Sequence, residues 1–174
     1  MMMRTGIWIA LLVPILGTAQ PGRCPKLPDS YSWNTARDYK REEDVVLRTL
    51  QWLNSTPLKS EFEMRSKANL FVMEWICGSP RIKISIQSEN LPFMEVTPDL
   101  LFPFIHGVAQ YKLSKNADAS ELHALVAGYN VVGFMIQSDE KLKKEKSLQP
   151  IAKAYKKEKM QVYVESVLSK SSQK

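Results

Sequence analysis

Residues 72–87 read VMEWICGSPRIKISIQ and carry two opposite structural signals. The part up to Cys77 is apolar on nearly every side, which indicates the end of a buried helix. Gly78 suits the left-handed residue that often follows a helix, and Pro80 prevents the helix from continuing. Residues 82–87 then alternate isoleucine with polar residues, which is the period of a strand. This stretch therefore decides between an all-α fold and one that contains a sheet.

The rest of the chain offers residues 82–87 no clear partner strand. The nearest candidate, MQVYVESVL at 160–168, places its apolar residues at i, i+3, i+4, i+7 and i+8, as a helix does. An unpaired strand would leave its backbone hydrogen-bonding groups unsatisfied. We therefore expect residues 79–96 to form an extended or irregular connector, and not a strand.

Helix signals flank this connector. Thr35 and Asp38 form a capping-box pattern before an amphipathic helix that stops at 55–57, and a second helix is expected over 62–77. Beyond the connector, Thr97 followed by proline and aspartate indicates the start of a third helix.

The third helix is expected to reach about Leu113, with a kink at Pro103 unless the helix starts later. A fourth helix opens at 118–121 and carries little further charge, so we expect it at the centre of the fold. Its Gly128 would let a neighbouring helix approach closely. A fifth helix is expected after Ser147.

Five helices with connections of modest length predict an all-α fold, a roughly five-helix up-and-down bundle with one extended or irregular connector at about 79–96. The remaining divisions follow from the same pattern. They are an extended proline-rich lead at 20–35, a single helical domain at 36–170 and a flexible tail at 171–174.

The N-terminal residues MMMRTGIWIALLVPILGTAQ have the parts of an export signal: a basic residue at Arg4, an apolar run over 6–16, and a small-x-small site ending at Ala19. Residues 1–19 are therefore expected to be a signal peptide that is cleaved near Ala19. The apolar run is shorter than the roughly 20 residues that a membrane span needs. We expect an exported protein, periplasmic or secreted, that is not an integral membrane protein.

The formal net charge of +6 is unevenly placed along the chain. From Lys141 to the end, ten lysines stand against three glutamates, whereas residues 20–140 carry a small acidic excess. Such a lysine-rich C-terminal helix could bind a protein or an anionic envelope component, although most exposed lysine faces are simply solvated. Export argues against a nucleic-acid partner. The C-terminal segment also holds no arginine, the residue that favours bidentate phosphate recognition.

The two cysteines, Cys24 and Cys77, leave two alternatives open. In an oxidising compartment they could form a disulfide that ties the lead to the end of the second helix, or they could remain separate thiols. A catalytic role for Cys77 is disfavoured, because the residues before it are apolar and the negative end of a helix disfavours a thiolate.

Glu74 lies within the apolar end of the second helix. A buried carboxylate with a raised pKa would be a candidate general acid, whereas an ion pair or simple exposure would be the structural alternative. The candidate partners for an ion pair are Arg65, Arg81 and His106.

Four polar residues on largely apolar helices are candidates for a ligand pocket between helices: Arg65, Asn69, His123 and Asn130. The alternative is a polar network that fixes helix register. With only two histidines and no ligand spacing of the usual kind, the sequence predicts no metal site and no cofactor.

Three stretches, LRTLQWLNSTPL, ANLFVMEWICGSP and ELHALVAGYN, together with the glutamine after the cleavage site, resemble a group of small exported helical proteins of Bacteroidota. That group has no assigned mechanism, so the resemblance implies an exported helical protein and no functional residues.

These observations favour an exported helical domain that acts without catalysis, by binding or as a scaffold. Two alternatives remain: an envelope hydrolase that uses Glu74 as its general acid, and a carrier of a small apolar ligand held between helices.

Overall fold

The computed structural model of the protein describes residues 22–115 and 119–171, which contain seven α-helices and no strand. The all-α prediction is confirmed. The predicted signal peptide, Asp118 and most of the predicted tail lie outside the described residues. The helices are α1 (Ala36–Ser55), α2 (Phe62–Gly78), α3 (Leu101–Lys115), α4 (Glu121–Ser138), α5 (Glu140–Lys144), α6 (Gln149–Lys156) and α7 (Met160–Ser171).

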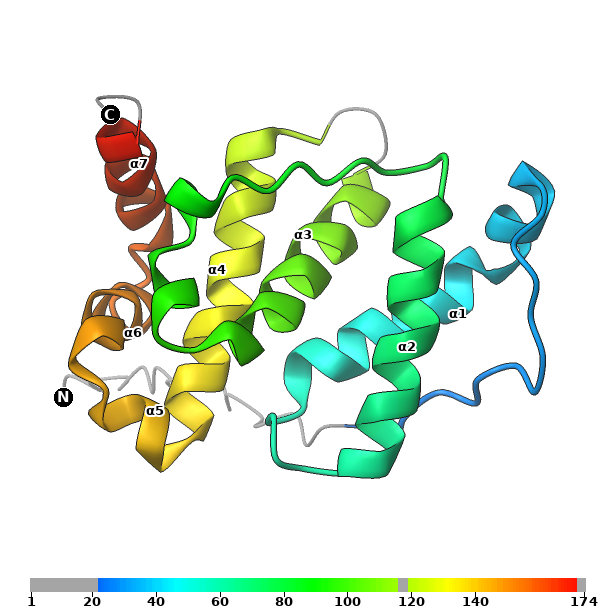
Figure 1. Cartoon of the computed structure of the whole chain (residues 1–174), viewed down its shortest axis with the longest axis horizontal. Coiled ribbons are helices and arrows are strands. Elements are labelled where there is room, and N and C mark those ends of the chain that lie inside the picture. The colour runs from blue at the N-terminus through cyan, green and yellow to red at the C-terminus, as the bar shows by residue number, and fades with distance from the viewer. Residues whose placement is uncertain (1–21, 116–118, 172–174) are drawn as a thin grey trace, which may run out of the picture.

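Helices α3 and α4 cross at the centre of the molecule, with α1 and α2 on one side and α5 to α7 on the other (Figure 1). Their close approach depends on two glycines. A Cβ atom on Gly107 would lie 2.7 Å from the carbonyl oxygen of Ala127, and one on Gly128 would lie 2.8 Å from the ring of Phe104. The predicted close approach at Gly128 is thereby confirmed.

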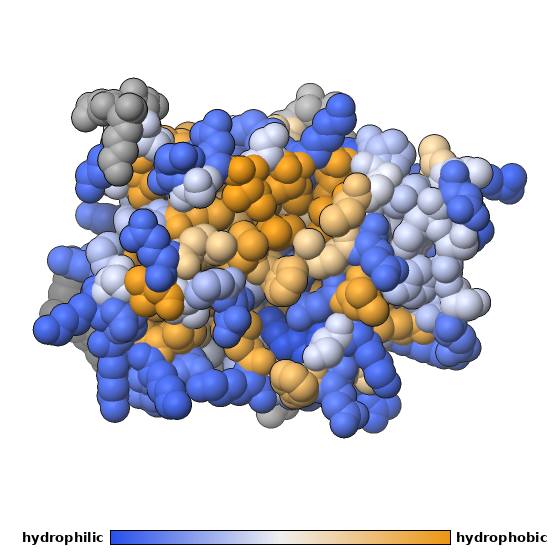
Figure 2. All heavy atoms as spheres, in the orientation of Figure 1, coloured by the Kyte–Doolittle hydropathy of each residue, from blue (hydrophilic) through white to orange (hydrophobic). Residues whose placement is uncertain are grey.

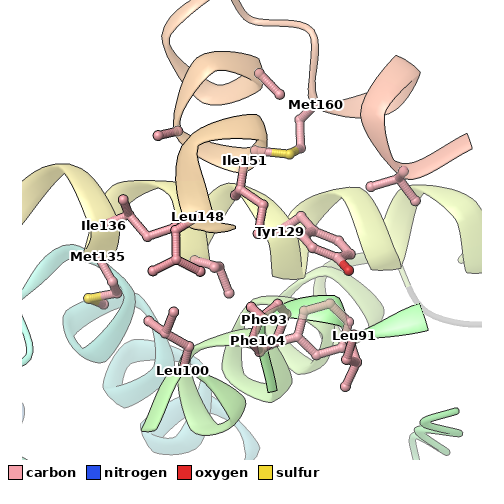
Figure 3. Packing of buried hydrophobic residues seen from close by; sticks show 14 of the residues in the cluster. Leu91, Phe93, Leu100, Phe104, Tyr129, Met135, Ile136, Leu148, Ile151 and Met160 are labelled. Carbon is pink, nitrogen blue, oxygen red and sulfur yellow. The ribbon is translucent and has the colours of Figure 1, made fainter. Parts of the chain in front are cut away.

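The buried apolar side chains form two clusters, and α3 contributes to both. One cluster joins α1, α2 and the N-terminal lead to the end of α3. The other joins α3 to α4, α6 and α7, and Figure 3 shows its aromatic centre, where Phe93, Phe104 and Tyr129 lie side by side. The ring centroids of Phe104 and Tyr129 are 5.3 Å apart in an edge-to-face arrangement, which aromatic pairs prefer.

The connector at 79–96 runs across the top of α3 and α4 in Figure 1 and contains two 3₁₀ turns but no strand, as predicted. Side chains tie it to the helices. The ammonium group of Lys112 donates to the carbonyl oxygen of Lys83 at 2.7 Å and also pairs with Glu121. The hydroxyl of Tyr129 donates to the carbonyl oxygen of Asn90 at 2.5 Å.

Two details of the helix ends differ from the prediction. Gly78 belongs to α2 and has no left-handed conformation. A Cβ there would lie 2.0 Å from the hydroxyl oxygen of Tyr39, so a larger residue would displace the Tyr39 side chain. Pro103 causes no interior kink, because α3 begins at Leu101 after a 3₁₀ turn and the proline falls in its first turn.

The predicted fifth helix is broken into α6 and α7. Glu158 adopts a left-handed φ of 54°. The amide of Lys159 donates to the carbonyl oxygen of Ala154, and the amide of Glu158 donates to the carbonyl oxygen of Tyr155. These two bonds are those of a Schellman C-cap, which normally has glycine at the left-handed position. Because glutamate stands there, the sequence carries no signal of the break.

Candidate functional site

A pocket of about 880 Å³ lies between the first turns of α2, the start of α3 and α5, near the lower ends of α2 and α3 in Figure 1. We call it the α2–α5 pocket. Its walls are mainly apolar, with several charged side chains among them. The lining residues used below are Lys59, Phe62, Arg65, Asn69, Phe102 and Asp139.

Two exposed aromatic side chains line this pocket. Phe62 is 75% exposed and Phe102 is 46% exposed, and both line it. The large apolar side chains that are exposed in the described residues are Phe62, Met64, Leu70, Ile86, Val96, Phe102 and Val162. Of these seven, Phe62 and Phe102 line the α2–α5 pocket and the other five do not. Ligand sites are lined mainly by apolar and aromatic side chains, so two exposed phenylalanines in one pocket make it a candidate binding site.

Apolar residues also gather over the middle of the face shown in Figure 2, where the connector and α3 run in Figure 1. Ile86 and Val96, at 40% and 42% exposed, contribute to the apolar surface of the connector.

Arg65 forms part of the pocket wall and is itself buried. Its guanidinium donates from Nη1 to the carbonyl oxygen of Thr56 at 2.7 Å and from Nη2 to that of Leu53 at 3.2 Å. These two carbonyl groups lie at the C-terminal end of α1, where they would otherwise lack a hydrogen-bond donor. Burial lowers the pKa of Arg65 to about 10, which still leaves it charged at neutral pH. Arg65 therefore joins the end of α1 to the start of α2.

Besides Arg65, the lining holds four charged side chains: Lys59 and Asp139 form an ion pair, and Asp99 and Lys141 are exposed. Lys59 pairs with Asp139 at 2.5 Å. The second oxygen of Asp139 caps α5 by accepting from the amides of Lys141 and Leu142. The hydrogen bond from Lys59, followed by the amide bonds, lowers the pKa of Asp139. The ion pair thus closes one side of the pocket by linking the loop before α2 to the start of α5.

Asn69 lies one helical turn beyond Arg65 and also lines the pocket. Its side-chain oxygen Oδ1 is buried and has no hydrogen-bond partner among the residues that the structure describes. Buried polar atoms are nearly always paired, so this oxygen is an exception, but its burial also keeps it out of reach of a ligand in the pocket.

His106 lies behind the pocket wall. It is fully buried, neither ring nitrogen has a hydrogen-bond partner among the described residues, and its ring stacks on Phe102 at 6.3 Å. Burial, and then the positive charge of Arg65, lowers its pKa to about 3. His106 is therefore neutral and supports the position of Phe102.

The four predicted pocket residues do not meet at one site. Arg65 and Asn69 line the α2–α5 pocket, but His123 is exposed, with its ring 6.4 Å from that of Tyr111. Asn130 is exposed and lines a different pocket, of about 630 Å³, between α4 and the junction of α6 and α7. The aromatic residues Phe62 and Phe102 were not predicted, because no sequence pattern distinguishes an exposed phenylalanine from a buried one.

Glu74 is exposed and lines none of the four pockets described for residues 22–115 and 119–171. Simple exposure, the structural alternative for Glu74, is therefore what the structure shows, and the buried carboxylate that a general acid would need is absent at this position. Its neighbour is Tyr31, whose pKa is raised by burial and then by the hydrogen bond to Glu74. Of the predicted ion-pair partners, Arg81 instead contacts Glu43 at 3.1 Å.

Both cysteines are free thiols, so the disulfide alternative is absent from this structure. Cys24 is buried and Cys77 is exposed. Burial, and then the charge of Glu61, raises the pKa of the Cys24 thiol, which disfavours its reactive thiolate form.

Among the described residues, no group of three or more histidine, cysteine, aspartate or glutamate side chains is placed to hold a metal ion. In the same part of the chain, none of the helices combines the length and the apolar character that a membrane crossing needs.

Comparison with known proteins gave no match: no family model, no curated protein and no solved structure is significantly similar to the chain.

Proposed function

We propose that the protein is a non-enzymatic binding protein that holds an apolar ligand in the α2–α5 pocket. The observation that carries this proposal is that two exposed phenylalanines, Phe62 and Phe102, both line the pocket. Aromatic side chains offer a large apolar contact area, and leaving them in water has a free-energy cost that a bound ligand would remove.

A binding role is better supported than catalysis because the carboxylates of the pocket are poorly suited to acid or base work. Asp139 is held by Lys59 and by two backbone amides, and Asp99 is exposed. The hydrolase alternative placed the general acid at Glu74, which lies outside the pocket. A pair of carboxylates around a substrate would be needed for glycoside hydrolysis, and Glu74 has no such partner in a shared pocket.

The proposal is tested with the fluorescent probe N-phenyl-1-naphthylamine, whose emission rises in an apolar site. Phe62→Ser and Phe102→Ser should each weaken saturable binding about tenfold, since each removes a large part of the apolar wall. Val162→Ser is the matched control, because Val162 is 63% exposed on α7 and does not line the pocket. Equal binding by all four proteins would reject the proposal.

We also propose that the protein is exported, which the pattern of residues 1–19 supports. The intact mass of the protein purified from its own host tests this directly. Loss of residues 1–19 is the expected result, and a mass that still includes them would contradict cleavage near Ala19.

A second candidate function is binding of an anionic envelope component by the lysine-rich C-terminal region. Lys153, Lys156, Lys157 and Lys159 are exposed around the end of α6 and have no ion pair among the described residues. Sedimentation with phosphatidylglycerol vesicles should fall with rising salt and in the double variant Lys156→Gln, Lys157→Gln. Unchanged sedimentation of that variant, or no binding at low salt, would reject this candidate.

A further inference from the structure

We infer that residues 82–87 of the connector are a docking site for an extended, acidic peptide segment of a partner protein, which pairs with them as an added β-strand. This surface is separate from the α2–α5 pocket, whose lining holds none of these residues. Residues 82–87 have the alternation of a strand, yet the described part of the chain provides no strand to pair with them.

The backbone of this segment is extended and largely without hydrogen-bond partners. Residues 82–87 form no helix or turn, and the connector crosses α3 and α4 as an uncoiled chain in Figure 1. Among the described residues, none of their N–H groups donates a hydrogen bond, and only the carbonyl oxygens of Lys83 and Gln87 accept one. Buried backbone groups are nearly always paired, so unpaired ones normally face water, where another chain can reach them.

One edge of the segment is held by the protein itself. The carbonyl oxygen of Lys83 accepts from Lys112 of α3 at 2.7 Å, and that of Gln87 accepts from a backbone amide of the following 3₁₀ turn at 3.0 Å. Alternate residues of a strand direct their backbone groups to the same edge. The opposite edge therefore belongs to the isoleucines at 82, 84 and 86, and none of its backbone groups has a partner among the described residues.

The free edge is accessible at Ile84 and Ile86. Ile84 is half-buried and packs against both apolar clusters, so the segment rests on the helices, and Ile86 is 40% exposed. Ile82 is buried, which places the centre of any pairing at the other two isoleucines. An unpaired strand edge is a template for strand addition, in which backbone hydrogen bonds supply the affinity.

The side chains of the segment define the chemistry of the partner. Lys83 is the one charged residue in 82–87, is exposed, and has no ion pair among the described residues. A carboxylate opposite Lys83 on the added strand would form a cross-strand ion pair. Apolar residues gather on this face of the molecule in Figure 2, which favours apolar side chains at alternate positions of the added strand.

The fluorescein-labelled peptide TVEVTVE is the probe, because its valines alternate with polar residues that include two glutamates. Fluorescence anisotropy measures its binding. N-methylation at its second, fourth and sixth residues, or at its third, fifth and seventh, removes the N–H donors of one peptide edge. One pattern should weaken binding about tenfold or more and the other should leave it nearly unchanged. TVKVTVK should bind about tenfold more weakly than TVEVTVE, since its lysines repel Lys83.

Amide hydrogen exchange tests the same pairing on the protein. Saturating TVEVTVE should slow exchange about tenfold at Ile84 and Ile86, and should leave Lys83 and Ser85 unchanged. Ile86→Pro removes a donor from the free edge and should weaken binding about tenfold. Ser85→Pro removes one from the other edge, and Ile86→Val keeps the donor, so both should bind normally. The methylated peptides leave the protein unaltered, so they test the pairing even if a proline variant does not fold.

Strand addition would be overturned by the absence of saturable binding, by equal effects of the two methylation patterns, or by equal slowing at all four amides. Equal binding of TVKVTVK and TVEVTVE would overturn the acidic partner. A dimeric mass in sedimentation, with exchange at Ile84 and Ile86 that slows as the protein concentration rises without peptide, would show that a second copy occupies the edge and would overturn the partner assigned here.

Discussion

Arg65 of α2 holds the carbonyl end of α1 through its bond to the carbonyl oxygen of Thr56, 2.7 Å from Nη1. This bond fixes the position at which α2 leaves α1, and the first turns of α2 form one wall of the α2–α5 pocket. The pocket is therefore built on the same contact that stabilises the helix pair. Substitution of Arg65 therefore tests stability, whereas substitution of Phe62 or Phe102 tests binding.

Arg65→Met is expected to lower the free energy of unfolding by about 3 kcal/mol, because two carbonyl oxygens at the end of α1 would lose a charged donor. Urea denaturation measures the change. Lys67→Met is the control on the exposed face of the same helix and should change stability by less than about 0.5 kcal/mol. Equal effects of the two substitutions would contradict the role given to Arg65.

Gly128→Ala is expected to destabilise the protein by about 1–3 kcal/mol through overpacking between α3 and α4. The added Cβ would lie 2.8 Å from the Phe104 ring and 2.9 Å from its carbonyl oxygen. Gly22→Ala meets no atom within 4 Å and should be nearly neutral. Thermal unfolding of the two variants provides the comparison, and a melting temperature for Gly128→Ala at or above that of the unaltered protein would show that the helices are less closely packed.

His106 predicts a dependence of stability on pH. Its pKa is about 3 in the folded protein, because of burial and then Arg65, and about 6.5 in an unfolded chain. Below pH 6.5 the unfolded state therefore binds a proton that the folded state does not, and stability is lost progressively as the pH falls from 6.5 towards 3. The free energy of unfolding should be about 2 kcal/mol lower at pH 5 than at pH 7.

His106→Leu should remove most of this difference between pH 5 and pH 7, whereas His123→Gln, at an exposed position, should retain it. Urea denaturation at the two pH values measures each difference. If the leucine variant shows the same loss as the unaltered protein, another group is responsible.

Lys112→Met should loosen the connector, because the carbonyl oxygen of Lys83 would lose its donor and Glu121 its partner. Limited trypsin digestion is suited to this test, since Arg81 and Lys83 are cleavage sites within the connector. Cleavage there should be about tenfold faster, which corresponds to about 1.4 kcal/mol of lost local stability. Lys115→Met, at the exposed end of α3, should leave the cleavage rate unchanged.

The two thiols should differ in reactivity with 5,5′-dithiobis(2-nitrobenzoic acid). Cys77 is exposed and should react in the folded protein, whereas Cys24 is buried and should react only after unfolding. Cys77→Ser should abolish the fast phase. Protein that shows no free thiol even when unfolded, and regains two on reduction, would instead contain the disulfide that this structure lacks.

Much of the fold follows from local signals in the sequence. The Thr35 and Asp38 capping box is present and opens α1 where expected. The connector at 82–87 could be distinguished from a strand only by the lack of a partner elsewhere in the chain. The break at Glu158 and the role of Gly78 could not be predicted, because one depends on a left-handed glutamate and the other on the distant ring of Tyr39.

The candidate site was predictable only in part, for a physical reason. Arg65 and Asn69 stood out as polar groups on a largely apolar helix, and both line the pocket. Phe62 and Phe102 did not stand out, because their exposure depends on how α2 and α3 begin relative to α5. His123 and Asn130 share a helix but lie on its exposed positions, away from this pocket.

The most direct test of ligand binding in the α2–α5 pocket is a titration of the isotope-labelled protein with N-phenyl-1-naphthylamine, followed by amide chemical shifts in nuclear magnetic resonance spectra. Saturable shifts should centre on the residues of the lining, among them Phe62, Arg65, Asn69 and Phe102. Shifts that centre on α7 and the 3₁₀ turns of the connector, where a second pocket of about 540 Å³ lies, or the absence of saturable shifts, would contradict the proposed site.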